Sequence, residues 1–91
     1  MASIYNNKSL AKHNVTQQEV DQVVASFRSV WIPMSKSTRG FERVMIVGFT
    51  NSGRLLEVGV ELFLNDDLHY FHADNATKVY KREYELRTKH D

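Results

Sequence analysis

Residues 42–63, ERVMIVGFTNSGRLLEVGVELF, decide the fold of this chain. The stretch from Arg43 to Phe49 is almost continuously apolar, which is typical of a strand that is buried on both faces. Residues 51–54, Asn-Ser-Gly-Arg, favour a turn, and the strand pattern resumes from Leu55 to Phe63. We therefore predict a β-hairpin at the centre of the molecule.

Strand-forming residues flank this hairpin on both sides. Residues 30–32, Val-Trp-Ile, favour a short strand, and Pro33 restricts that strand to the edge of a sheet. Residues 65–67, Asn-Asp-Asp, favour a second turn, after which Leu68–His72 again reads as a strand. The sequence thus predicts an antiparallel β-meander of three to four strands.

Two helices are expected before the sheet. A short helix over Ser9–His13 would end at Asn14, because asparagine tolerates the left-handed conformation at a helix end. Thr16 and Glu19 have the spacing of a capping box, in which each side chain accepts from the other residue's amide. The second helix, Gln17–Arg28, presents one apolar face made of Val20, Val23, Val24 and Phe27.

A third helix is expected at the C-terminal end. Asp74 or Asn75 can cap it, and apolar residues then recur near helical spacing at Ala76, Val79, Tyr80 and Tyr84. We expect residues 1–7 to be frayed. The order of elements indicates one α+β domain over residues 1–91, with the helices on one side of an antiparallel sheet.

The composition is that of a globular protein. Hydrophobic residues make up 42% and charged residues 25% of the chain. The chain has no cysteine, which fits a reducing compartment, and its N-terminal region lacks the apolar core of a signal peptide. No stretch is long enough to cross a membrane. We therefore expect a cytoplasmic protein with no membrane partner.

The charges are unevenly distributed although the net charge is only +1. One basic segment carries Lys36, Arg39, Arg43 and Arg54, and another carries Lys78, Lys81, Arg82, Arg87 and Lys89. Acidic residues concentrate between them, in residues 57–67. Such an asymmetry attracts polyanions, although the same charges can simply solvate the surface.

Several kinds of catalytic or binding site are excluded. The four glycines are scattered and form no phosphate-binding loop, and no serine nucleophile elbow is present. His69 and His72 are three residues apart, so on a regular strand they would point to opposite faces and could not share a metal ion. We expect no metal and no cofactor.

The remaining side chains suit the cleavage of RNA without a metal ion. That reaction needs a base for the 2′-hydroxyl proton, cations for the phosphorane and a donor for the leaving oxygen. His72 and Tyr80 are the acid-base candidates, and Lys81 and Arg82 are the catalytic cations. Arg54 and Lys78 are candidate RNA-binding residues. The alternative for Arg54 is an exposed arginine with no role.

Two further residues have a functional and a structural interpretation. Arg43 lies at a strand start, where it could line the RNA-binding groove or pair with Glu57 across the hairpin. His13 could orient the RNA, or it could complement the dipole at the end of the first helix.

Four segments, in this order, resemble the BrnT family of bacterial ribonuclease toxins, which share the RelE-like fold. Residues 12–16, KHNVT, are similar to the family's KHGV segment, and residues 42–48, ERVMIVG, to its E-R-x-x-x-x-G strand. Residues 53–58, GRLLEV, resemble its G-R-L-L-x-V return, and residues 73–77, ADNAT, its A-R-x-A-T segment. The resemblance covers residues 8–85.

The resemblance implies a toxin of a type II toxin-antitoxin system. Such a toxin inhibits translation by cutting RNA and is neutralised by a cognate antitoxin, usually a ribbon-helix-helix DNA-binding protein. The chain differs from the family at Asp74, where an arginine is usual, at Tyr80, where a glutamate is usual, and over residues 61–63. These differences favour an alternative, in which the scaffold serves as a non-catalytic binding or regulatory protein. Another alternative is a nucleic-acid binder unrelated to toxins.

Overall fold

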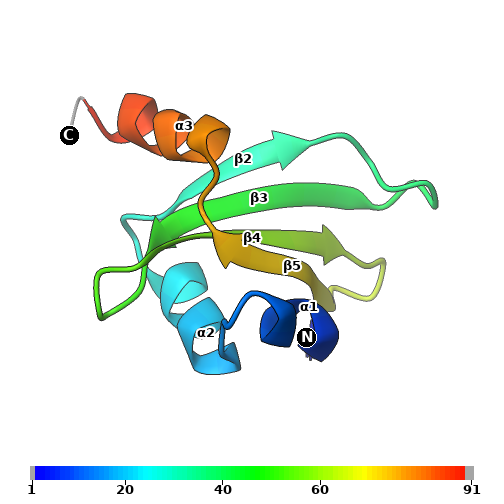
Figure 1. Cartoon of the computed structure of the whole chain (residues 1–91). Coiled ribbons are helices and arrows are strands. Elements are labelled where there is room, and N and C mark those ends of the chain that lie inside the picture. Colours follow the sequence, from blue (N-terminus) through cyan, green and yellow to red (C-terminus); the bar gives the residue numbers. More distant parts are fainter. Residues whose placement is uncertain (1, 90–91) are drawn as a thin grey trace.

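The structure is a computed structural model that describes residues 2–89. It contains five strands and three helices (Figure 1). In chain order these are β1 (Ser3–Tyr5), α1 (Asn7–Lys12), α2 (Gln17–Ala25), β2 (Val30–Met34), β3 (Glu42–Phe49), β4 (Leu55–Leu62), β5 (Leu68–Asn75) and α3 (Lys78–Thr88). The α+β class and the two N-terminal helices are confirmed.

The sheet is mixed rather than purely antiparallel. Its strand order is β1-β5-β4-β3-β2, and β2 to β5 form the predicted antiparallel meander. The prediction of three to four strands was wrong because Ser3–Tyr5 adds a fifth, parallel to β5. The same strand shows that residues 3–5 are not frayed. Tyr5 helps to hold it, since its hydroxyl donates a hydrogen bond to Asp21 of α2.

The helices cover both faces of the sheet, not one as expected (Figure 1). Helices α1 and α2 pack on one face over a closed core. This core consists of Leu10, Val15, Val20, Val23, Ile46, Leu56, Val58, Val60, Tyr70 and Ala73. Helix α3 lies on the opposite face over a smaller cluster, in which Ile32, Met45 and Val47 are buried.

Helix α2 follows its local sequence signals closely at its start. Thr16 and Glu19 form the predicted capping box, and Asn14 has the left-handed conformation, with φ 55°. The helix ends at Ala25, three residues earlier than predicted. Phe27 therefore lies outside it and is 91% exposed, so its assignment to the apolar face was wrong.

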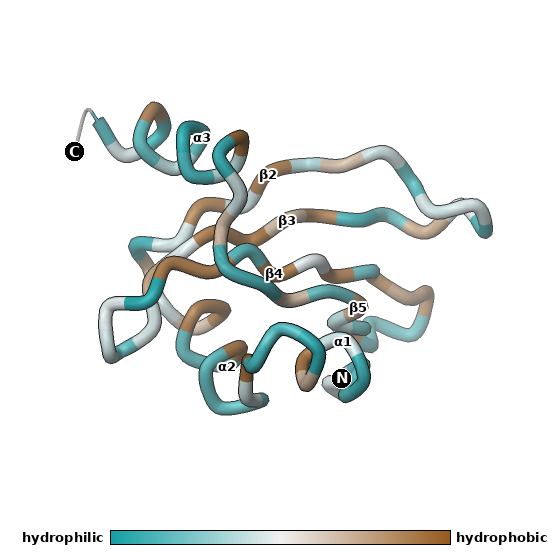
Figure 2. Tube along the Cα trace, viewed as in Figure 1, coloured by the Kyte–Doolittle hydropathy of each residue, from teal (hydrophilic) through white to brown (hydrophobic). Residues whose placement is uncertain are grey.

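Helix α3 covers only part of its face. It has no fully buried residue, and Figure 2 shows it as mostly hydrophilic. Its N-cap is Thr77 rather than Asp74 or Asn75, because both of those residues still belong to β5. Among residues 2–89, no helix lies over the start of β3, the end of β4 and the start of β5 on this face (Figure 1). This open part of the sheet is where polar side chains collect.

Candidate functional site

A β-bulge arranges the polar residues of β5. His69 lies opposite Glu61 and His72 lies opposite Gly59, so three steps on β5 match two steps on β4. Paired residues share a face of the sheet, and Gly59 and Glu61 are two residues apart. His69 and His72 therefore lie on the same face. The prediction of opposite faces was wrong because it assumed a regular strand.

Gly59 leaves room for the Phe71 ring where the bulge brings that ring over the sheet. A Cβ at position 59 would lie 2.7 Å from the Phe71 Cζ atom, which is closer than non-bonded carbon atoms approach in folded proteins, so the ring would have to shift. The guanidinium of Arg43 lies 5.6 Å from the centre of the Phe71 ring on the same face. This distance suits a cation–π contact. The open face thus carries an aromatic ring with a cation above it.

His72 is held by a buried carboxylate. Its Nε2 lies 2.9 Å from Oε2 of Glu57, whose side chain is only 5% exposed. The other oxygen of Glu57 accepts from the backbone N–H of Thr77 at 2.6 Å. Glu57 therefore ties β4 to β5 and to the start of α3, where the helix dipole favours a negative charge.

The contacts of this pair shift the pKa values of both groups. The hydrogen bond to Glu57 raises the pKa of His72 against the opposing effect of burial, and the charges of Glu57 and Asp74 add to the rise. Burial alone would raise the pKa of Glu57, but its hydrogen bonds to His72 and Thr77 outweigh burial and lower it. His72 thus holds a proton more readily than an isolated histidine does.

A second histidine approaches from α1. The Nδ1 atom of His13 lies 3.2 Å from Oδ2 of Asp74, and the rings of His13 and His72 are 5.9 Å apart. The two meet beside β5 because β1 pairs with residues 68–70, and no other strand of the described chain lies along the rest of that edge. Asp74, one of the differences from the BrnT pattern, thus has a defined partner.

Both histidines line one groove, which we call the edge groove. Its walls come from α1 and β5 and consist of Asn6, Lys8, Ser9, Lys12, His13, Phe71 and His72. Lys8 and Lys12 are exposed. They lie four residues apart and so share a side of α1. The edge groove therefore combines two imidazoles, two ammonium groups and an aromatic ring.

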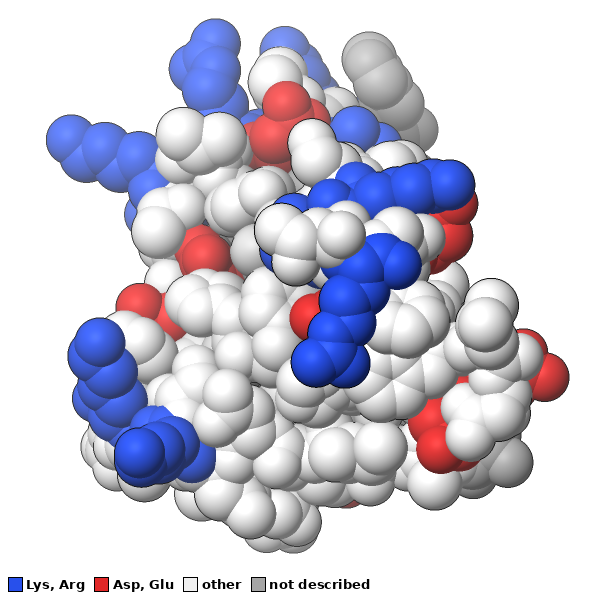
Figure 3. All heavy atoms as spheres, turned by 90° about the vertical axis from the view of Figure 1, so that its right-hand side faces the viewer, with Lys and Arg blue, Asp and Glu red and all other residues white. Residues whose placement is uncertain are grey.

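The structure separates the other predicted residues from this groove. Tyr80 packs against the cluster beneath α3, and Lys78, Lys81 and Arg82 are exposed on that helix. None of these four residues lines the edge groove. Figure 3 shows lysines and arginines in separate groups on the face it displays, rather than in one continuous patch.

Arg54 has a structural role. Its Nη2 donates to the carbonyl of His13, and its Nη1 donates to the carbonyl of Asn14 and lies 3.4 Å from the Glu19 carboxylate. Its Nε donates to Asn75 at 2.8 Å. The guanidinium thus joins the α1–α2 loop to α2 and β5, on the face opposite α3. It does not share a concavity with Lys81 and Arg82.

Arg43 follows neither of its two sequence interpretations completely. Its Nε donates to the carbonyl of Ser35, and its neighbour across the hairpin is Glu61, not Glu57. Its position over Phe71 places it on the open face, next to the edge groove.

Sequence reasoning missed Glu57, Lys8 and Lys12 as site residues. Glu57 stands in the middle of an otherwise apolar strand, LLEVGVEL, and a carboxylate at such a position needs a buried partner. The sequence therefore contained a signal for Glu57. Lys8 and Lys12 gave no such signal, because their role depends on where α1 packs against the sheet.

Comparison with known protein families and with curated proteins finds no match for this chain. In residues 2–89 no group of three or more potential ligands could hold a metal ion. None of the helices in this range is long and apolar enough to cross a membrane.

Proposed function

We propose that the protein cleaves RNA in the edge groove by acid-base chemistry. The observation that carries this proposal is the pair His13 and His72, 5.9 Å apart in one groove, each held by a carboxylate. Cleavage next to a 2′-hydroxyl needs two proton-transfer groups on either side of one phosphate. Two imidazoles at this separation can serve as that pair.

The roles of the histidines follow from their surroundings. His13 takes the proton of the 2′-hydroxyl through Nε2, the nitrogen that Asp74 leaves free. The 2′-oxygen then attacks phosphorus and the bond to the 5′-oxygen breaks, which yields a 2′,3′-cyclic phosphate. His72, whose pKa is raised by its bond to Glu57, gives its proton to the leaving 5′-oxygen. Lys8 and Lys12 stabilise the negative charge of the phosphorane.

A comparison of two double variants, each lacking one pair of cations, tests this assignment. Lys8→Ala/Lys12→Ala and Lys81→Ala/Arg82→Ala each remove two positive charges from exposed positions of a helix. Cleavage of a fluorescent single-stranded RNA should fall by about 10²-fold or more in the first variant, as for loss of a transition-state donor, and little in the second. The opposite result would indicate that the catalytic cations lie on α3, as predicted from the sequence.

Single histidine variants test the chemistry itself. His13→Ala and His72→Ala should each reduce cleavage by about 10²–10⁴-fold, the usual contribution of a general acid or base. The products should carry cyclic phosphate and 5′-hydroxyl ends. Unchanged RNA at a large excess of wild-type protein would refute the enzymatic proposal and favour a non-catalytic RNA-binding or regulatory protein.

The biological role that we propose is that of a type II toxin with a RelE-like fold, and its support is the ordered resemblance of residues 8–85 to the BrnT family. A ribbon-helix-helix antitoxin would then be its partner. Expression should arrest growth, and co-expression of the neighbouring gene should relieve the arrest. Arrest that persists in the His13→Ala/His72→Ala variant would separate toxicity from RNA cleavage.

A further inference from the structure

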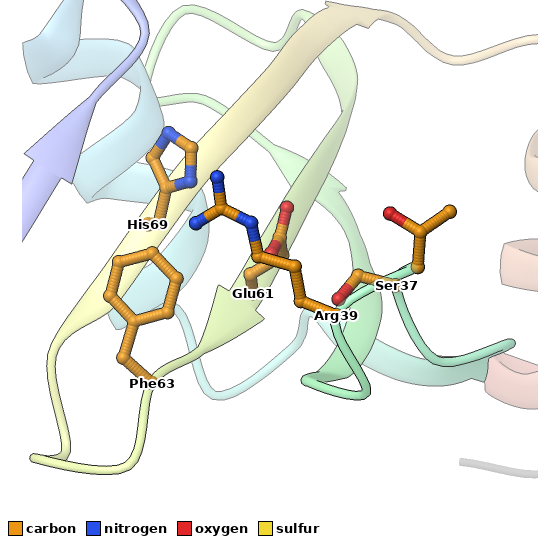
Figure 4. A pocket seen from close by; sticks show the side chains of 6 residues that line it. Ser37, Arg39, Glu61, Phe63 and His69 are labelled. Atoms are coloured by element: carbon orange, nitrogen blue, oxygen red, sulfur yellow. The ribbon is translucent and has the colours of Figure 1, made fainter.

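A second hollow lies on the same open face of the sheet, between the β2–β3 loop and the ends of β4 and β5 (Figure 4). We call it the loop pocket. It is lined by Ser37, Thr38, Arg39, Glu61, Phe63 and His69. Figure 4 shows Arg39 extending from its loop toward His69 and Glu61, with the ring of Phe63 beside them.

The loop pocket and the edge groove are neighbours along one strand ladder. Gly59 lies opposite His72 of the edge groove, and Glu61 lies opposite His69 of the loop pocket. Two residues of a strand span about 7 Å. Phe71 and Arg43 lie on the face between them. An RNA strand held at the edge groove can therefore place an adjacent nucleotide in the loop pocket.

Aromatic rings form one wall of the loop pocket. The ring of Phe63 lies 5.5 Å from that of His69 and 5.0 Å from that of Phe41. Phe63 and His69 are half-buried, so each keeps some surface exposed. Unstacked RNA bases are commonly bound on such rings.

The two charged side chains of the loop pocket have no partner within the described part of the protein. In the described range 2–89, neither Glu61 nor Arg39 takes part in a side-chain hydrogen bond or an ion pair. Glu61 is half-buried on the sheet, so its carboxylate is held in place but stays accessible. A ligand can supply hydrogen-bond donors to its two oxygens.

We infer that the loop pocket binds a guanine base of the RNA. Among the four bases only guanine has two adjacent donors, N1–H and N2–H, on its Watson–Crick edge, and these match the two oxygens of Glu61. Adenine, cytosine and uracil each place an acceptor beside their donor, which a carboxylate repels. The base stacks on Phe63 and His69, and Arg39 contacts its O6 or a phosphate. This inference rests on the proposed function for its RNA substrate.

Nucleotide titrations of the full chain, followed by NMR, test the inference without requiring cleavage. Guanosine monophosphate should bind about tenfold or more tightly than adenosine monophosphate, as for one bidentate pair. Inosine monophosphate lacks the N2 amino group and should lose most of that preference. Glu61→Gln should abolish the preference, whereas Glu42→Gln should keep it, because Glu42 lies opposite Leu62 and faces the other side of the sheet. Arg39→Ala, at an exposed loop position, should weaken the binding of guanosine monophosphate.

The outcomes separate the two proposals. A guanine preference that Glu61→Gln removes, in a protein that does not cut RNA, supports the pocket and refutes the nuclease. RNA cleavage with equal affinity for the guanosine and adenosine nucleotides refutes the pocket and leaves the nuclease. Resonance shifts from guanosine monophosphate that avoid residues 61–69 also refute the pocket.

Discussion

The two faces of the sheet are built on different principles. The face under α1 and α2 is closed, and its central residues, such as Ile46 and Val58, are completely buried. The opposite face has α3 over one end and is open at the other, where Glu61, His69 and His72 keep exposed surface. The comparison indicates that the first face supplies most of the stability, and that the second is thereby free to carry polar groups.

A cavity in the closed face should produce the largest loss of stability. Ile46→Ala removes a completely buried side chain, which costs about 2–5 kcal/mol in the free energy of unfolding. Chemical denaturation measures this loss. The matched control is Val79→Ala on α3, where the valine is 69% exposed and the change should be within about 0.5 kcal/mol. Similar losses in both variants would contradict the division between the two faces.

A methyl group on the open face should affect the site more than the fold. Gly59→Ala forces the Phe71 ring to move, since the new Cβ would lie 2.7 Å from its Cζ. Because the end of the half-buried Phe71 ring can shift, the loss of unfolding free energy should lie near the lower end of the about 1–3 kcal/mol that overpacking costs in cores. We expect RNA binding to weaken, because Phe71 is a wall of the edge groove.

The Gly59→Ala variant has a natural control in Gly53→Ala. Gly53 lies in the β3–β4 turn with φ +89° and has open space around it, so alanine there strains the backbone without touching the groove. Its unfolding free energy should also fall, while its RNA affinity stays that of the wild type. Equal RNA affinities for both alanine variants would show that Phe71 takes no part in binding.

The two faces also differ in how far their sequence could be interpreted. The closed core follows from periodicity: the alternation in β4 and the spacing of Val20 and Val23 in α2 identify buried positions directly. The positions of side chains on the opposite face depend on features of the tertiary structure that the hydrophobic periodicity does not predict. The bulge at Gly59 reverses the expected orientation of His72 relative to His69, and the docking of α1 brings His13 to Asp74.

Charge patterns in particular could not locate the site. Arg54 was a candidate RNA-binding residue because of its charge, yet its donors are taken up by two carbonyls, Asn75 and Glu19. Lys81 and Arg82 are exposed but lie on a different element from the histidines. A sequence gives the number of cations on a segment and not the side chains that they meet across the fold.

A smaller effect than that of the Ile46 cavity is expected from removing the charge that holds His72. Glu57→Gln keeps an oxygen for the Thr77 amide but turns an NH₂ group toward His72 Nε2, so the unfolding free energy should fall by about 1.5–3 kcal/mol near pH 6, as for the loss of a hydrogen bond to a charged group. The pKa of His72, followed by NMR, should fall toward the ordinary histidine value because the hydrogen bond and charge of Glu57 are its main causes. Glu85→Gln, a change at an exposed carboxylate on α3, should leave that pKa unaltered.

The difference in unfolding free energy between the wild type and Glu57→Gln should depend on pH in a defined direction. A raised histidine pKa contributes stability that is complete below about pH 6.5, the unfolded value, and is lost as pH rises through the folded value. The lowered pKa of Glu57 contributes stability above about pH 4.3, which is lost as pH falls through its folded value. The unfolding free energy of the wild type should therefore exceed that of Glu57→Gln most between these two pH values, and the difference should shrink at higher pH. An advantage that grows from pH 7 to 9 would show that Glu57 acts on the fold by some route other than the protonated His72.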